Sequence, residues 1–229
     1  MISLAVGRGC APPALLPPLR VPLVALTALA ALLLVSLGSY YSGDSTPGGL
    51  DRSLMAAAGD PAEPALALAV FVDFGGEPVG AAILVTVLAA LCLTLHHFRL
   101  AVLALAGPAL TVLTTTLLKP VFGRTINGEH LSYPSGHTAM ATALAVVFLL
   151  LVVQVFGIPL APAIALMFAG TVVAGAEMAW SQVALGAHYP TDTIGGYCTA
   201  LAVTTLTALV LDRVLDRYRQ RLNRPVPHH

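Results

Sequence analysis

Long apolar segments restrict this chain to a membrane-spanning helical bundle. They occupy residues 21–40, 78–95, 100–118, 137–156, 160–180 and 193–211. Each has about 20 residues, the length that a helix needs to cross the hydrocarbon core of a bilayer. Only 10% of the 229 residues are charged, against about 25% in a typical soluble domain. We therefore predict an all-α fold with six transmembrane helices in one bundle.

The segments outside these runs define the expected organisation of the chain. Residues 1–20 are Pro-rich and are predicted to form a flexible tail, residues 21–211 form the six-helix domain, and residues 212–229 form an Arg-rich tail. The final pair, His228-His229, resembles the remnant of an affinity tag. A signal peptide is the alternative for residues 21–40, but its apolar core would usually span about 7–15 residues, so an uncleaved helix is favoured.

Two shorter segments do not fit the spanning pattern. Residues 50–58 are predicted to form a short interfacial helix between Gly- and Pro-containing stretches. Residues 65–74 are apolar but too short to span alone, and Gly75-Gly76-Glu77-Pro78 interrupts them.

The basic residues predict how the helices are oriented. One side of the predicted bundle carries Arg8, Arg20, Arg99, Arg213, Arg217, Arg219, Arg221 and Arg224, and the other carries Arg52, Lys119 and Arg124. Because cytoplasmic loops are enriched in Lys and Arg, both termini are expected in the cytoplasm. The polar loops over residues 119–136 and 181–192 are then extracytoplasmic. The Ala-, Val- and Pro-rich composition favours a bacterial plasma membrane.

The polar residues best suited to binding and catalysis lie in those two loops. They are Lys119, Arg124, Pro134-Ser135-Gly136-His137, Ser181, Gln182, His188 and Asp192. Alternating helix directions bring the ends of the third to sixth spans to one face, so these groups are expected around one cavity.

Together they supply what phosphoryl transfer requires, namely cations, a nucleophile and a proton donor. His188 and Asp192 are four residues apart and share one face of a helix, so the carboxylate could orient the imidazole. The alternative is an interfacial His beside a helix-capping Asp. Lys119 and Arg124 could bind phosphate oxygens, or they could anchor helix ends by snorkelling.

Four further residues are candidates for the same site. Ser135 and Gly136 open a helix whose backbone N–H groups suit an anion, although Ser135 also fits an ordinary N-cap. His137 can exchange protons near neutral pH. Glu177, an ionisable residue within a span, is a functional candidate that could pair with Lys119 or Arg124, or it is simply hydrated at the interface.

Metal and cofactor chemistry has less support in the sequence. A metal site built from His130, His137, His188 and Asp192 is a competing use of these groups, but the spacing shows neither two His four residues apart nor a nearby Cys. The three cysteines, Cys10, Cys92 and Cys198, are far apart and indicate neither a disulfide framework nor a metal site. We expect no cofactor and no nucleic-acid partner.

Residues 119–192 resemble the type 2 phosphatidic acid phosphatase family of integral membrane phosphatases. That family carries a Lys followed by Arg-Pro, then Pro-Ser-Gly-His, then Ser-Arg-x5-His-x3-Asp. The second motif is complete here, and the third is kept as Ser181, His188 and Asp192. Two positions depart from the pattern: Ile126 lies where the first-motif Arg is expected, and Gln182 replaces the third-motif Arg. Gln can donate a hydrogen bond but carries no charge.

The resemblance implies a role for each matching residue. His188 attacks phosphorus and forms a phosphohistidine, Asp192 orients it, and His137 protonates the leaving oxygen. The phosphoryl oxygens are held by Lys119, Arg124, Ser135, Gly136, Ser181 and Gln182, without a metal.

The implied function is dephosphorylation of a lipid phosphate or diphosphate at the outer membrane face. Polyprenyl and glycerophospholipid phosphates both fit this description. Alternatives are a lipid-linked phosphotransferase that uses the same residues, a non-catalytic lipid-phosphate binder and a small transporter. The lipid identity and the oligomeric state stay open.

Overall fold

The computed structural model describes residues 12–59 and 61–222. Within these residues the elements are α1 (Pro17–Tyr40), α2 (Gly49–Ala58), α3 (Ala65–Phe74), α4 (Pro78–Thr94), α5 (Phe98–Phe122), β1 (Thr125–Ile126), β2 (His130–Leu131), α6 (Gly136–Val155), α7 (Leu160–Ala184) and α8 (Pro190–Leu222). The predicted all-α architecture is confirmed, with one minimal antiparallel hairpin inserted between α5 and α6. The predictions on Arg8, Cys10, Arg224 and His228-His229 lie outside the described residues.

Five helices are long and apolar enough to cross a membrane, namely α1, α5, α6, α7 and α8. The pair α3 and α4 passes the same test together, but it is bent by 62° at the break between the two helices. The break follows from the sequence, because Gly75 and Gly76 disfavour a helix and Pro78 suits the first position of a new one. The predicted six spans are therefore obtained when this bent pair counts as one span.

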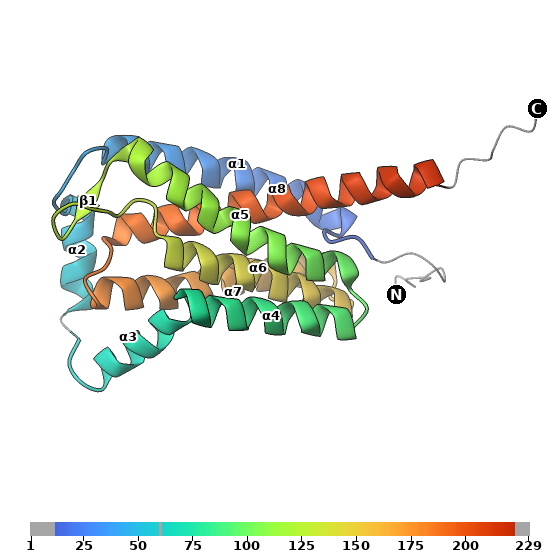
Figure 1. The fold of residues 1–229 in the computed structure, drawn as a ribbon, viewed down its shortest axis with the longest axis horizontal. Coiled ribbons are helices and arrows are strands. Elements are labelled where there is room, and N and C mark those ends of the chain that lie inside the picture. Colours follow the sequence, from blue (N-terminus) through green and yellow to red (C-terminus); the bar gives the residue numbers. More distant parts are fainter. Residues whose placement is uncertain (1–11, 60, 223–229) are drawn as a thin grey trace, which may run out of the picture.

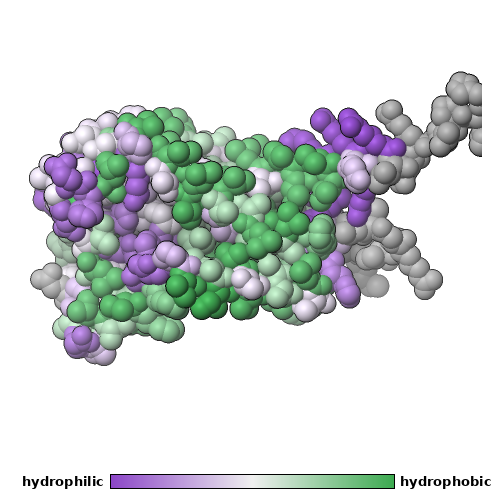
Figure 2. Space-filling model, in the orientation of Figure 1, coloured by the Kyte–Doolittle hydropathy of each residue, from purple (hydrophilic) through white to green (hydrophobic). Residues whose placement is uncertain are grey.

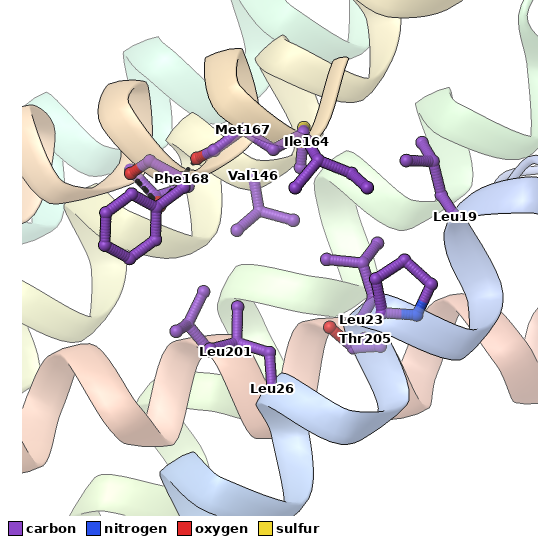
Figure 3. Close-up of a pocket in the computed structure, with 11 residues that line it drawn as sticks. Leu19, Leu23, Leu26, Val146, Ile164, Met167, Phe168, Leu201 and Thr205 are labelled. Carbon is purple, nitrogen blue, oxygen red and sulfur yellow. Dashed lines mark hydrogen bonds between the residues drawn. The ribbon is translucent and has the colours of Figure 1, made fainter. Parts of the chain in front are cut away.

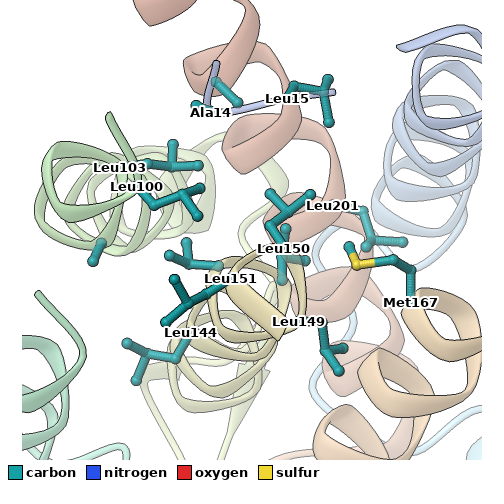
Figure 4. Close-up of a cluster of buried hydrophobic side chains, with 14 of the residues drawn as sticks. Ala14, Leu15, Leu100, Leu103, Leu144, Leu149, Leu150, Leu151, Met167 and Leu201 are labelled. Carbon is teal, nitrogen blue, oxygen red and sulfur yellow. The ribbon is translucent and has the colours of Figure 1, made fainter. Parts of the chain in front are cut away.

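The long helices pack side by side along one axis (Figure 1). Helix α8 packs against α1, α5 and α6, and α6 also packs against α5 and α7. Figure 4 shows the resulting core, in which Leu149, Leu150 and Leu151 of α6 lie among side chains of the neighbouring helices, such as Leu103 of α5, Met167 of α7 and Leu201 of α8. Helix α6 is thus enclosed by its neighbours and gives the bundle a fixed centre.

Apolar side chains cover much of the long face of the bundle seen in Figure 2, while hydrophilic residues gather toward its two ends. Large side chains in this belt are widely exposed, including Leu32 at 66%, Val87 at 60% and Leu117 at 62%. A soluble protein rarely exposes so large a contiguous apolar surface. The chain is an integral membrane protein.

The end of the bundle where α1 begins and α8 finishes has a polar anchor. Asp212 is buried and accepts hydrogen bonds from the backbone N–H groups of Ala14 and Leu15 and from Arg99. The described part of the predicted N-terminal tail is therefore packed, and α1 starts at Pro17. Helix α8 also continues to Leu222 rather than stopping at the predicted position 211, because polar residues end an apolar span without ending a helix.

Candidate functional site

The polar loops meet at the opposite end of the bundle, beside α2 and the hairpin (Figure 1). Helix α5 brings Lys119 to this end and stops at Gly123, whose φ of 63° is a left-handed conformation suited to glycine. The chain then turns through Arg124 into the hairpin. Ser135 caps the start of α6, where its side chain accepts a hydrogen bond from Thr138 N. The N-terminal turn of α6, with Gly136 and His137, therefore lies at the same end as Lys119.

Two adjacent glycines in α8 fix how closely this turn meets the last helix. A Cβ on Gly196 would lie 2.3 Å from Ser135 O, and one on Gly195 would lie 2.5 Å from the Tyr133 ring. The backbone N–H of Ser135 also donates to Asp192 O at 2.9 Å. The Pro-Ser-Gly-His turn is thus held against the segment that carries the His-x3-Asp step. The motif pattern did not predict this contact, although small residues in a span are a usable packing signal.

His188 lies in the loop just before α8. Its Nδ1 atom is 3.6 Å from Oδ2 of Asp192. That is slightly longer than a hydrogen bond, as is common in catalytic sites without substrate, and Nδ1 has no other hydrogen-bond partner among the described residues. Burial lowers the pKa of His188 below its ordinary value, although Asp192 opposes this shift. A neutral imidazole facing a carboxylate is a suitable nucleophile.

Asp192 is held in place by Arg124, which is fully buried. One guanidinium nitrogen donates to Asp192 Oδ1 and to Thr191 Oγ1, each at 2.6 Å, and the other pairs with Asp51 Oδ2 at 2.5 Å. Burial alone would raise the pKa of Asp51, but hydrogen bonds from Thr191, Arg124 and Gly48 outweigh it and hold the pKa below its ordinary value. Asp51 therefore faces the guanidinium in its charged form.

Two tyrosine rings also pack on the Arg124 guanidinium. The rings of Tyr41 and Tyr189 lie 4.4 and 4.5 Å from its central carbon, within cation–π range. Arg124 was predicted to bind phosphate oxygens, and the structure places it inside this enclosure instead of at an open surface. Lys119 is only partly buried, and its charge acts on both His188 and Asp192.

The first residues of the third motif face α3. Ser181 Oγ donates to Ala69 O at 2.7 Å, and Gln182 Nε2 donates to Asp73 Oδ1 at 2.6 Å. Ser181 and Gln182 are buried at 0% and 1% exposure. The two residues predicted to touch phosphate thus join α3 to α7.

This docking of α3 brings two carboxylates to His137. The Nε2 atom of His137 lies 3.6 Å from Asp73 Oδ1 and 3.6 Å from Glu77 Oε1. Gly76 lies between these two residues in the sequence, and a Cβ added to it would be 2.3 Å from the His137 ring. The bend between α3 and α4 therefore packs directly on the imidazole. The sequence did not predict this cluster, because Asp73 and Glu77 appear there only as acidic residues beside the Gly75-Gly76 interruption of an apolar segment.

The same cluster is where a divalent cation could bind. Asp73, Glu77 and His137 each offer one ligand atom, and these atoms lie within 4.8 Å of one another. Carboxylate and imidazole ligands suit Mn²⁺ or Zn²⁺. His130, from the metal set considered earlier, is exposed in β2 with its Nδ1 atom 3.2 Å from Asn127 O.

Two other features lie outside the site. Glu177 is exposed on α7, and Arg124 pairs with Asp51 and Asp192 rather than with it. Figure 3 shows an apolar cavity of about 250 Å³ between α1, α6, α7 and α8. Its lining includes Leu26 and Phe168 but none of the site residues described above.

The fold and the polar end define an integral membrane protein with an array of His, Asp and Lys at one end of its helices. The family model for the PAP2 superfamily matches residues 81–215, more than half of the chain, and the chain belongs to this superfamily. Members of this superfamily are phosphatases, so the chain is assigned to the phosphoric ester hydrolases. No curated protein and no solved structure gave a significant match. The matched region leaves out Asp51, Asp73 and Glu77.

Proposed function

We propose that the chain is a lipid phosphatase that acts through a phosphohistidine at the extracytoplasmic face. The main support for this proposal is that His188 Nδ1 approaches Asp192 at the same end of the bundle as His137 and Lys119. Asp192 keeps the proton on Nδ1, so the lone pair on Nε2 is directed outward. That nitrogen attacks phosphorus, a P–N bond forms and the P–O bond to the lipid breaks.

His137 completes the proton transfers. It gives its proton to the leaving oxygen, which departs as a neutral alcohol or as a protonated phosphate. In the second step His137 removes a proton from water, and the water oxygen displaces His188 from phosphorus. Inorganic phosphate leaves, and both imidazoles return to their starting states. No step in this scheme requires a metal.

Lys119 and the N-terminal turn of α6 are the groups we assign to the phosphoryl oxygens. Lys119 supplies positive charge, and the backbone N–H groups near Ser135 and Gly136 supply oriented donors. We assign Arg124 a positioning role, because its guanidinium is enclosed by Asp51, Asp192 and two tyrosine rings. Arg124 acts through Asp192, which in turn orients His188.

A lipid is the expected substrate because the reacting end belongs to a membrane-embedded bundle. The distribution of Arg and Lys supports an outer-leaflet site with both termini in the cytoplasm, as in a bacterial plasma membrane. Polyprenyl and glycerophospholipid phosphates both fit. A phosphotransferase would use the same residues and would yield a phosphorylated acceptor in place of free phosphate.

The test is phosphate release by the purified protein in detergent with a chelator present. The lipids are a polyprenyl diphosphate, a polyprenyl monophosphate, phosphatidic acid and phosphatidylglycerol phosphate. His188→Ala should lower release from the preferred lipid by at least about 10³-fold, because the covalent route is lost. His130→Ala, an exposed histidine in the hairpin, is the matched control and should retain activity.

Two outcomes would count against the proposal. Equal release by wild type and His188→Ala would remove the phosphohistidine step. Binding of lipid phosphate by well-folded protein without any turnover would favour a non-catalytic binder or a transporter.

A further inference from the structure

We propose that Asp73 and Glu77 make the leaving-group side of this site negative, so that it prefers lipid monophosphate esters over lipid diphosphates. The inference rests on the proposed function, in which His137 protonates the leaving oxygen. It uses two carboxylates that lie outside the region matched by the superfamily. It therefore concerns a property of this chain beyond the shared motifs.

The position of the leaving group follows from the geometry around His137. Its Nε2 atom lies 3.6 Å from an oxygen of Asp73 and 3.6 Å from an oxygen of Glu77. A proton donor must come within about 3 Å of the oxygen that it protonates. An oxygen protonated by Nε2 therefore lies within about 7 Å of both carboxylates. Donation from the other ring nitrogen would lengthen this distance only by the width of the ring.

Asp73 is held in place by its neighbours on α7 rather than free to swing away. Gln182 is 1% exposed and donates to Asp73 at 2.6 Å, while Ser181 fixes the preceding turn of α3 through Ala69 O. The Gln182 amide is neutral, so it holds Asp73 without cancelling its charge. An Arg at the same position would neutralise that charge. The departure of Gln182 from the family pattern thus preserves a negative charge beside His137.

The neighbouring cations do not compensate for this charge. Arg124 is balanced by Asp51 and Asp192, both at ion-pair distance. Lys119 also acts on the charge of His188. Unlike Arg124, it has no carboxylate at ion-pair distance among the described residues. Lys119 is assigned to the phosphoryl group under attack, so the leaving side keeps the negative charge of Asp73 and Glu77.

The two classes of lipid differ in the charge of what departs. A monophosphate ester releases an alcohol, which is neutral once His137 has protonated it. A diphosphate releases a lipid monophosphate, which still carries negative charge. Repulsion between such a group and a carboxylate about 7 Å away, at the effective dielectric of a protein surface, lowers the rate by at least about tenfold.

The experiment compares kcat/KM for a polyprenyl monophosphate and a polyprenyl diphosphate of the same chain length, with a chelator present. Wild type should favour the monophosphate by at least about tenfold, and Glu77→Gln should reduce this ratio by about tenfold. Glu77 is 51% exposed, so the substitution should not disturb folding. Asp73→Asn is the second variant and should reduce the ratio in the same direction. Glu129→Gln, an exposed carboxylate of the hairpin turn, is the control and should leave the ratio unchanged.

Several results would overturn the proposal. One is a wild-type preference for the diphosphate, and another is a ratio that neither Glu77→Gln nor Asp73→Asn changes. A third is calorimetric binding of Mn²⁺ to wild type but not to Glu77→Gln without substrate, which would assign the cluster to a cation. Failure of the proposed function looks different: neither lipid would release phosphate in a His188-dependent manner, and both ideas would fall.

Discussion

At the scale of single residues, Arg124 shows how a buried charge can hold the polar side chains of the candidate site in place. Its guanidinium faces Asp51 and Asp192, all three side chains are fully buried, and two tyrosine rings lie within cation–π range. Removing one member of a buried ion cluster is costly, because the remaining charges stay uncompensated. Arg124 therefore holds Asp192 in position beside His188.

The pH dependence of the reaction should reflect the buried environment of His188. In the proposed mechanism the neutral imidazole is the nucleophile, so activity is expected above the pKa of His188 and should be lost as the pH falls through it. Because burial lowers that pKa, we expect the acid limb of kcat/KM to lie below about pH 6.5, the ordinary value for histidine. A profile from about pH 4.5 to 8 would check this, with Tm over the same range as a control for unfolding. An acid limb above the ordinary histidine value would contradict this reading.

The sequence predicted which polar residues gather at one end, but not all of their partners. Lys119, His137, His188 and Asp192 follow from motif spacing and helix direction. The partners of Arg124 and Gln182 do not, because Asp51 is 73 residues from Arg124 and Asp73 is 109 residues from Gln182. No local pattern links such distant positions, and only packing of α2 and α3 on the bundle brings them together.

At the scale of elements, the site depends on close contact between the starts of α6 and α8. Gly195 and Gly196 remove side chains where α8 meets Tyr133 and Ser135. The bend between α3 and α4 plays a similar part on the other side, where Gly76 lies against the His137 ring. Small residues at these contacts set the distances between the groups of the candidate site.

Gly196→Ala should therefore impair activity through the position of α8. The added Cβ would meet Ser135 O at 2.3 Å, so α8 must shift together with His188 and Asp192. Overpacking of this kind costs about 1–3 kcal/mol, and we expect a lower Tm and at least about a tenfold loss in kcat/KM. The control is Gly49→Ala in α2, where a Cβ meets nothing within 4 Å. Wild-type kinetics for Gly196→Ala would show that the contact adapts.

At the scale of the whole molecule, the two ends of the bundle have different chemistry. The end with Asp212 carries a structural cluster with Arg99 and, on α8, a basic extension that reaches beyond the bundle (Figure 1). The other end carries the candidate site. A belt of exposed apolar residues separates them (Figure 2), so the site reaches only one leaflet.

The orientation can be measured by cysteine labelling in a background without native cysteines. His130→Cys and Arg217→Cys replace exposed residues at the two ends. We expect a membrane-impermeant maleimide to label His130→Cys in intact cells and Arg217→Cys only after permeabilisation, since the basic side should face the cytoplasm. The reverse pattern would place the site in the cytoplasm.

The sequence by itself determined the membrane-spanning class, the approximate helices and the gathering of the motif residues at one end. These properties depend on hydropathy and local spacing, which act over one or two helices. The tertiary structure decided that Arg124 faces carboxylates, that Gln182 holds Asp73, and that Asp73 and Glu77 surround His137. Those contacts depend on how α2 and α3 pack on the bundle, because only this packing brings residues that are distant in the sequence within hydrogen-bonding distance.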